Sequence, residues 1–302
     1  MLPFDRYSGT IGGIPLPRGG RADVGIDIPG TGRRDRDYLL HVWGRSGHRH
    51  AARAGARGKM NAMNIPAADL MSALRSGQST APRLTWYGPD AERVELSGRV
   101  LDNWVAKTSN LLQDELDAEP GTRLRLDLPA HWKSVVLALA AWQLGMEVVL
   151  ADGDAELLAT ADPGPAAAAG GVDAVLAVAL PALAMRWPGE LPSGVLDYAA
   201  EVRSHGDFFM ANVDPEPDRT ALRDAAGVDH PHGRLVEDFG ALPKVADDGA
   251  VAPRLLVRAG EGLEAALSRA LWAWSRDGSV VLVHPDVALT ERLLGDERIS
   301  HR

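Results

Sequence analysis

The 302-residue sequence contains no cysteine. This absence excludes disulfide bonds, zinc-thiolate sites and thiol nucleophiles, so that any nucleophile must be an oxygen or a nitrogen atom. Long apolar runs are also missing, because residues 135–142 and 174–185 fall short of the roughly 20 residues that span a bilayer. The sequence lacks the charged, apolar and small-residue regions of a secretory signal as well. We therefore expect a cytoplasmic protein that makes no contact with a membrane.

Positive charge is scarce outside the first 59 residues. That segment holds 11 Lys and Arg against 5 Asp and Glu, whereas the remainder holds 21 against 36. An acidic body repels nucleic acid, so only the basic segment could hold a polyanion. We predict that residues 1–62 are a disordered basic arm. The alternative is that Met60 or Met63 is the true start and that the upstream residues are an over-extended reading frame.

Residues 63–302 show the pattern of a single α/β domain, with a mostly parallel sheet flanked by helices. The clearest part is residues 97–149. Ser97 is placed to cap an amphipathic helix, Pro120-Gly121 ends that helix, and residues 124–128 alternate as a strand. A second helix, apolar nearly all round, is predicted at 134–144 with Gly145 at its end, followed by a buried strand at 147–150.

The remaining elements are predicted from weaker patterns. Hairpin strands are expected at 83–87 and 93–96, and a further βαβ unit at 254–284. We expect a short helix at 152–158, a loop at 163–171 and a strand at 174–180. Further helical segments are expected at 195–205, 220–228 and 234–242.

Several segments occur in the order and spacing of one large enzyme family. They are Leu84-Thr85-Trp86-Tyr87, Pro120-Gly121-Thr122-Arg123, Leu128-Pro129-Ala130 and the Ala- and Leu-rich run that ends at Leu144-Gly145. On these residues, the chain resembles the beginning of the adenylate-forming (AMP-binding) superfamily of acyl-CoA synthetases, peptide-synthetase adenylation domains and luciferases. Residues 179–187 and 194–202 look like a short actinobacterial branch of that superfamily. The resemblance implies a truncated form of the superfamily's N-terminal domain.

The superfamily's phosphate-binding loop reads Thr-Ser-Gly-Thr-Thr-Gly-x-Pro-Lys-Gly, and the matching segment here is residues 225–233. It is one residue shorter than the motif and retains Gly227, Pro231 and Gly233, while Asp229, His230 and His232 are among the residues that differ from it or have no counterpart in it. The hydroxyl groups are gone, His232 takes the place of the lysine, and Asp229 brings a carboxylate toward the expected phosphate. A competing register at residues 239–244 keeps Gly240, Pro243 and Lys244 but has no hydroxyl residues upstream.

Two other patterns were weighed against this interpretation. Gly260-Glu261-Gly262 lies between a strand and a helix, with Asp286 at the distance of a ribose contact, as in dinucleotide-binding folds. A tight strand-to-helix turn explains the same residues without a ligand. His230 and His232 form a His-x-His pair of the kind that chelates zinc, but no third ligand lies at a defined spacing, so we predict no metal site.

The resemblance would imply ATP or AMP as cofactor, but the altered loop argues against adenylation by this chain alone, and we predict no catalytic residue. The primary hypothesis is a pseudoenzyme that binds a small acyl or nucleotide-like ligand or a protein partner, with no nucleic-acid partner. The alternatives are an acyl- or aryl-CoA ligase completed by another chain, and a purely structural interaction module.

Overall fold

The computed structural model describes residues 67–76, 79–240 and 251–302, which all belong to one compact unit. The predicted arm at residues 1–62 lies outside the described residues, as do Pro243 and Lys244 of the competing phosphate-loop register. The first described elements are a 3-10 turn, η1 (Ala67–Asp69), and the short helix α1 (Leu70–Ser76).

The unit predicted at 97–149 is confirmed in every element. Helix α2 (Gly98–Glu115) starts after Ser97, whose hydroxyl accepts a hydrogen bond from the amide of Val100 at 3.3 Å. Helix α3 (Trp132–Leu144) ends at Gly145, which adopts the left-handed conformation (φ 79°) that lets the chain turn directly into β4 (Glu147–Val149).

The larger sheet has seven strands in the order β7-β6-β5-β3-β4-β8-β9. Neighbouring strands are parallel except for β8 and β9, which form an antiparallel hairpin at one edge. The strands other than β4 are β3 (Arg123–Asp127), β5 (Leu157–Thr160), β6 (Ala174–Ala177), β7 (Val195–Asp197), β8 (Thr220–Arg223) and β9 (Asp229–Pro231). This sheet is the mostly parallel one that the sequence predicts.

The smaller sheet joins the two ends of the described chain, in the order β10-β11-β1-β2. The predicted hairpin is present as β1 (Pro82–Tyr87) and β2 (Arg93–Ser97), which pair antiparallel. The predicted βαβ unit is present as β10 (Arg254–Arg258), α7 (Leu263–Trp274) and β11 (Ser279–Val283). Strand β1 pairs in parallel with β11, nearly 200 residues further along the chain.

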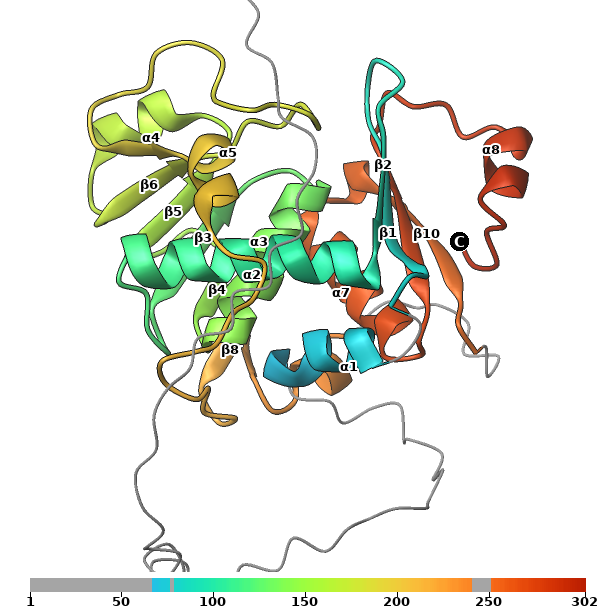
Figure 1. Ribbon diagram of the computed structural model, residues 1–302, viewed down its shortest axis with the longest axis horizontal. Helices are drawn as coiled ribbons and strands as arrows, with labels where there is room; N and C mark the ends of the chain where they lie inside the picture. The colour runs from blue at the N-terminus through green and yellow to red at the C-terminus, as the bar shows by residue number, and fades with distance from the viewer. Residues whose placement is uncertain (1–66, 77–78, 241–250) are drawn as a thin grey trace, which may run out of the picture. The chain divides into compact units, whose positions relative to one another are not determined.

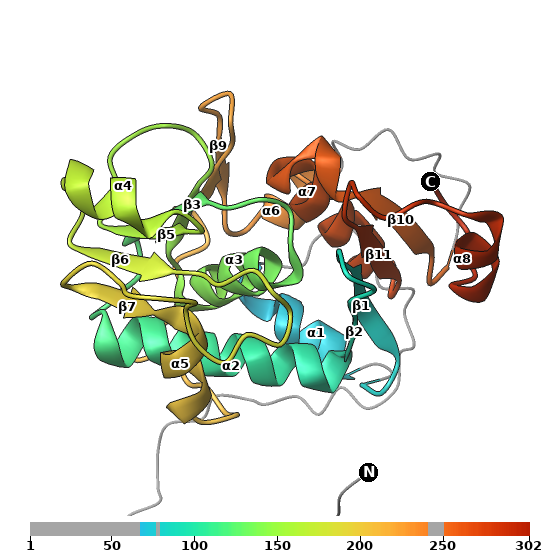
Figure 2. The same ribbon diagram turned by 90° about the horizontal axis from the view of Figure 1, so that it is seen from above.

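Helix α3 lies between the two sheets and contacts both of them, as Figures 1 and 2 show. Nearly all of its side chains are buried, which explains why its sequence is apolar on all sides. The indole Nε1 of Trp142 on α3 donates to the carbonyl of Ala221 on β8 at 2.9 Å. One hydrophobic core therefore extends from the larger sheet through α3 to α7 and the smaller sheet.

Four local predictions are wrong. Residues 157–160 form strand β5 where a helix was expected, and the expected loop holds the short helix α4 (Pro163–Ala169). The helix expected at 195–205 is divided into β7, α5 (Tyr198–Glu201) and η2 (Val202–Ser204). The helix expected at 220–228 is strand β8 and a turn, because pairing of Leu222 with Val148 of β4 outweighs a weak local preference.

The remaining elements are short. Helix α6 (Leu235–Asp238) follows the β8–β9 hairpin, η3 (Ala259–Glu261) precedes α7, and α8 (Glu291–Asp296) lies near the carboxyl terminus. Among the described residues, no helix has the length and apolar character needed to cross a membrane.

Candidate functional site

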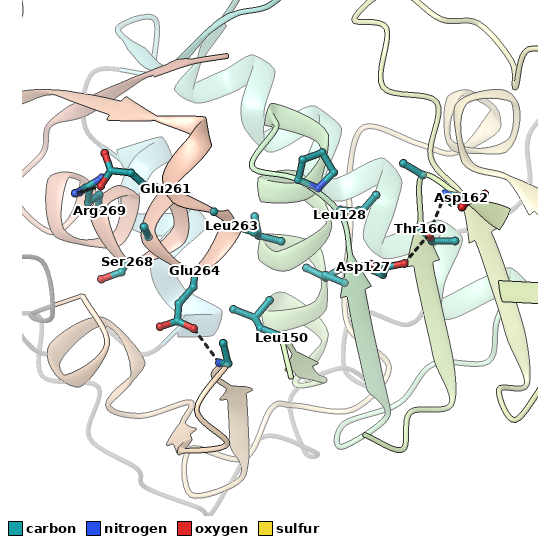
Figure 3. Close-up of a pocket in the computed structure, with 16 residues that line it drawn as sticks. Asp127, Leu128, Leu150, Thr160, Asp162, Glu261, Leu263, Glu264, Ser268 and Arg269 are labelled. Carbon is teal, nitrogen blue, oxygen red and sulfur yellow. Dashed lines mark hydrogen bonds and ion pairs between the residues drawn. The ribbon is translucent and has the colours of Figure 1, made fainter. Parts of the chain in front are cut away.

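A cavity of about 880 Å³ opens at the carboxyl ends of β3, β4, β5 and β8 and is closed on its other side by the first turns of α7. Ligands of open parallel sheets bind at this edge. Figure 3 shows Asp127 and Thr160 on the strand side and Glu261, Glu264 and Arg269 on the helix side. The turn between β8 and β9 reaches the cavity through Ala225.

The β8–β9 turn is the segment that the sequence matched to the phosphate loop, and each of its four amides is already hydrogen-bonded. Ala225 donates to Oε2 of Glu264 at 2.8 Å. Ala226 and Val228 both donate to Oδ1 of Asp224, at 3.0 and 2.8 Å, and Gly227 donates to the carbonyl of Asp224 at 2.9 Å. Two carboxylates of the chain thus hold amides of the loop in the way that a bound phosphate would.

Asp224 is buried and its carboxylate also contacts His230, with Nε2 of the imidazole 3.0 Å from Oδ2. Burial by itself raises the pKa of Asp224, but the hydrogen bonds from His230 and from the amides of Val228 and Ala226 outweigh it, and the pKa lies below its ordinary value. The carboxylate is therefore ionised at neutral pH and permanently occupies the inside of the turn.

Asp229, expected to bring its carboxylate toward the phosphate position, instead pairs with Arg223, whose Nε lies 2.8 Å from Oδ1. The pair is largely exposed, and the turn amides are held by Asp224 and Glu264 instead. Sequence analysis missed Asp224 because residues 220–228 were interpreted as helical. The signal was present, since Asp-x-x-Gly between two strand-forming segments is a turn pattern.

His232, which the sequence resemblance matches to the lysine of the superfamily motif, lies at the opposite end of the hairpin from the cavity. The strand register pairs Arg223 with Asp229 beside the turn, and the amide of His232 donates to Arg219 before the start of β8. Its ring is buried beside the backbone of Gly145 and Met146. Burial lowers the pKa of His232, so that the ring is uncharged and cannot replace a lysine.

The other predicted residues have structural positions. Pro231 ends β9, and Gly233 packs against Pro217, where an added Cβ would come within 3.2 Å. His230 and His232 do not converge on a common point with a third ligand, and the described residues contain no group of three potential metal ligands.

The Gly260-Glu261-Gly262 turn does lie at the cavity, where Gly262 precedes α7. The amino end of a helix attracts anions, but Glu261 and Glu264 bring their own carboxylates to it. Glu261 pairs with Arg269 at 2.5 Å, and this hydrogen bond holds the pKa of Glu261 below its ordinary value. Asp286, the predicted ribose contact, is not among the residues that line the cavity.

Substitution of Gly227 tests whether the turn requires the left-handed backbone conformation at this position. Gly227 has φ 80° with open space where a Cβ would be, while Gly153 also has open space but no positive φ. We expect Gly227→Ala to lower the free energy of unfolding by about 1–2 kcal/mol. Gly153→Ala should leave it unchanged or raise it by up to about 1 kcal/mol. Urea denaturation of both variants measures the difference, and equal stabilities would contradict the assignment.

Comparison with known proteins yields a close relative in sequence and several in structure. A protein of Mycobacterium tuberculosis (strain ATCC 25618 / H37Rv) described as a TIGR03089 family protein is 33% identical over 237 residues, which cover 72% of this chain and 90% of that protein. No family model matches the chain.

The solved structures that resemble the chain are adenylate-forming enzymes, including a Brucella canis acyl-CoA synthetase (TM-score 0.60, 19% identity). Others are the N-terminal domain of FACL13 from Mycobacterium tuberculosis (0.58, 17%) and the anthranilate CoA ligase AuaEII in complex with anthranoyl-AMP (0.56, 14%). Each match covers 78% of this chain but only 46%, 61% and 47% of the respective solved chain. The likeness establishes the α/β fold of part of an acyl-CoA synthetase N-terminal domain, as the sequence resemblance implied.

Proposed function

Because this chain belongs to the TIGR03089 family and has the fold of part of an acyl-CoA synthetase, we propose that it is a ligand-binding pseudoenzyme of that lineage, which does not adenylate carboxylic acids on its own. Its ligand occupies the cavity of about 880 Å³ between the strand ends and α7. The observation that carries this proposal is the occupation of the turn at 225–228 by the carboxylates of Asp224 and Glu264.

The backbone amides that a phosphate would need are already hydrogen-bonded within this protein. Phosphate-binding loops use free backbone amides, whereas here a phosphate would have to displace two ionised carboxylates that already accept those hydrogen bonds. Displacing Asp224 would also break its contact with His230 and leave a charge buried without a partner. The turn is therefore a stable structural element that is poorly suited to receive ATP.

The negative charge of the cavity also disfavours the binding of ATP. Asp127, Asp162, Glu261 and Glu264 line the cavity, and Arg269, the one basic lining residue in the described part of the chain, is paired with Glu261. A triphosphate would face net negative charge at short range, which costs free energy even with partial solvent screening. The volume is within the range of small-molecule sites, so the cavity suits an uncharged or cationic molecule better than a nucleotide.

Thermal-shift and pyrophosphate-exchange measurements test the absence of adenylation. We expect no stabilisation by Mg-ATP or AMP at millimolar concentration, whereas a ligand at a hundred times its Kd would add about 2.7 kcal/mol. We also expect no pyrophosphate exchange above a heat-inactivated blank with a panel of carboxylic acids. Stabilisation by ATP, or exchange with any acid, would overturn this part of the proposal.

Ligand binding is tested separately with a library of uncharged and cationic small molecules. We expect at least one to stabilise the protein, and the cavity-filling variant Ala265→Trp to abolish that stabilisation, because Ala265 lines the cavity. Ala168→Trp, on the exposed side of α4, is the control that should retain it. A library without a hit, or a hit that Ala265→Trp does not affect, contradicts binding at this site.

A further inference from the structure

A second pocket, of about 340 Å³, lies where loops from both sheets meet. Its lining comes from the end of β1 and from the segments that follow β1, β3, β6, β10 and β11, and it shares only Pro129 with the cavity beside the β8–β9 turn. Most of the lining is apolar, with Trp86, Leu180 and Pro285 among its residues. This combination of strand ends and an apolar wall is typical of small-molecule sites.

Hydrogen bonds hold the walls of this pocket in place. Nζ of Lys133, on α3, donates to the carbonyls of Ala179 and Pro181 at 2.5 and 2.9 Å. The carboxylate of Glu92 accepts from the amide of Ala182 at 2.8 Å and from Nε1 of Trp86 at 3.4 Å. The loop that carries Leu180 is thereby tied both to α3 and to the β1–β2 hairpin, so the pocket is preformed.

His131 lines the pocket with an imidazole that lacks one expected partner. The residue is 3% exposed, and its Nδ1 caps α3 by accepting a hydrogen bond from the amide of Lys133 at 3.2 Å. Burial lowers the pKa of His131 to about 3, assisted by the charges of Lys133 and His284. A neutral ring that accepts at Nδ1 carries its proton on Nε2, and Nε2 has no hydrogen-bond partner among the described residues.

An unpaired buried donor is rare in folded proteins and costs free energy unless a ligand or a water satisfies it. Beside it, the indole of Trp86 lies edge-on to the imidazole, with ring centroids 4.6 Å apart, and also lines the pocket. Trp86 contributes aromatic surface to the lining, while His131 supplies one hydrogen-bond donor. The pocket thus combines a mostly apolar surface with a directional hydrogen-bond donor at His131.

We propose that this pocket binds an uncharged, planar aromatic molecule with a carbonyl-type acceptor, which packs against Trp86 and accepts a hydrogen bond from Nε2 of His131. An anion is disfavoured because Asp90 and Glu92 line the pocket and His131 carries no charge. A cation gains little from Glu92, since both oxygens of that carboxylate already accept hydrogen bonds from the chain.

Calorimetric titration of the full chain with benzamide, benzoate and toluene tests the proposal. Benzamide has the ring and the acceptor, toluene has only the ring, and benzoate adds a negative charge. We expect benzamide to bind about tenfold more tightly than either of the others. His131→Phe should remove this preference over toluene while toluene still binds. Asp162→Asn, in the other cavity, is the control that should leave the affinity for benzamide unchanged.

A measurement on the wild-type protein keeps the test decisive if His131→Phe does not fold. With ¹⁵N-labelled histidine, we expect benzamide to shift the Nε2–H proton of one neutral imidazole downfield, and toluene to leave it unchanged. Failure of benzamide to bind, equal affinity for toluene, an undisturbed imidazole, or loss of binding in Asp162→Asn would each overturn the assignment.

Discussion

Replacing Asp224 by alanine is expected to lower the free energy of unfolding by about 3–5 kcal/mol, a large effect for a residue in a turn. The carboxylate is buried and accepts hydrogen bonds from the amides of Ala226 and Val228 while its other oxygen contacts His230. Alanine would remove all three interactions and leave the imidazole of His230 buried without its partner. Urea denaturation at neutral pH measures the loss.

Two further variants separate the roles of the Asp224 carboxylate. Asp224→Asn keeps an oxygen for the two amides and removes the charge. We therefore expect its free energy of unfolding to lie between those of the wild-type protein and Asp224→Ala. Asp229→Ala removes an exposed carboxylate that pairs with Arg223, and should cost no more than about 1 kcal/mol. If Asp224→Ala proved as mild as Asp229→Ala, the turn would not be held by Asp224, and the argument against phosphate binding would lose its basis.

The second large effect is a loss of stability in acid caused by His131. Its pKa in the folded protein is about 3, against about 6.5 in the unfolded chain. Between these values the unfolded state binds a proton that the folded state does not, so stability falls as the pH falls. The loss from this residue amounts to about 4 kcal/mol between pH 6.5 and 3, and to at most about 1.4 kcal/mol for each pH unit.

In variants that lack the imidazole of His131, the free energy of unfolding should depend less steeply on pH. We expect the free energy of unfolding of His131→Phe to fall less steeply than that of wild type between pH 6 and 4, by up to about 1.4 kcal/mol for each pH unit. His131→Gln serves as the matched control, because it packs differently but equally lacks the titrating group. Both variants should share the flatter slope despite different stabilities at pH 7. Slopes that match that of wild type would place His131 in contact with water.

How far the fold could be predicted from the sequence depended on how local its signals were. Helix α2 follows from the Ser97 cap and from its apolar spacing, and the α3–β4 junction follows from a glycine that adopts the left-handed conformation. Strand β8 lacked such a signal: its four residues become a strand because β4 and β9 flank them. Short segments of this kind are decided by partners that are distant in sequence.

In the candidate site, too, some features follow from the local sequence and others only from contacts between distant segments. From the sequence we predicted that residues 225–233 match the superfamily's phosphate loop without its hydroxyls and its lysine, and those differences follow directly from residue identity. The sequence suggested that the carboxylate of Asp229 would lie at the expected phosphate position. In the structure, the carboxylates of Asp224 and Glu264 accept hydrogen bonds from the amides of the turn. Glu264 comes from α7, some 40 residues away, so that contact exists only once the helix packs beside the hairpin.

Residue identity alone determined that this protein has no cysteine thiol, that its body is acidic, and that the segment matched to the superfamily's phosphate loop lacks the hydroxyls and the lysine of that loop. Tertiary structure decided which groups bind the amides of the turn at residues 225–228. Hairpin register moves His232 to the far end of β9, and packing of α7 brings Glu264 to the turn. Convergence of loops from two sheets leaves the imidazole of His131 buried at an apolar pocket. Each outcome depends on distances between residues far apart in the chain, which only the packed fold defines.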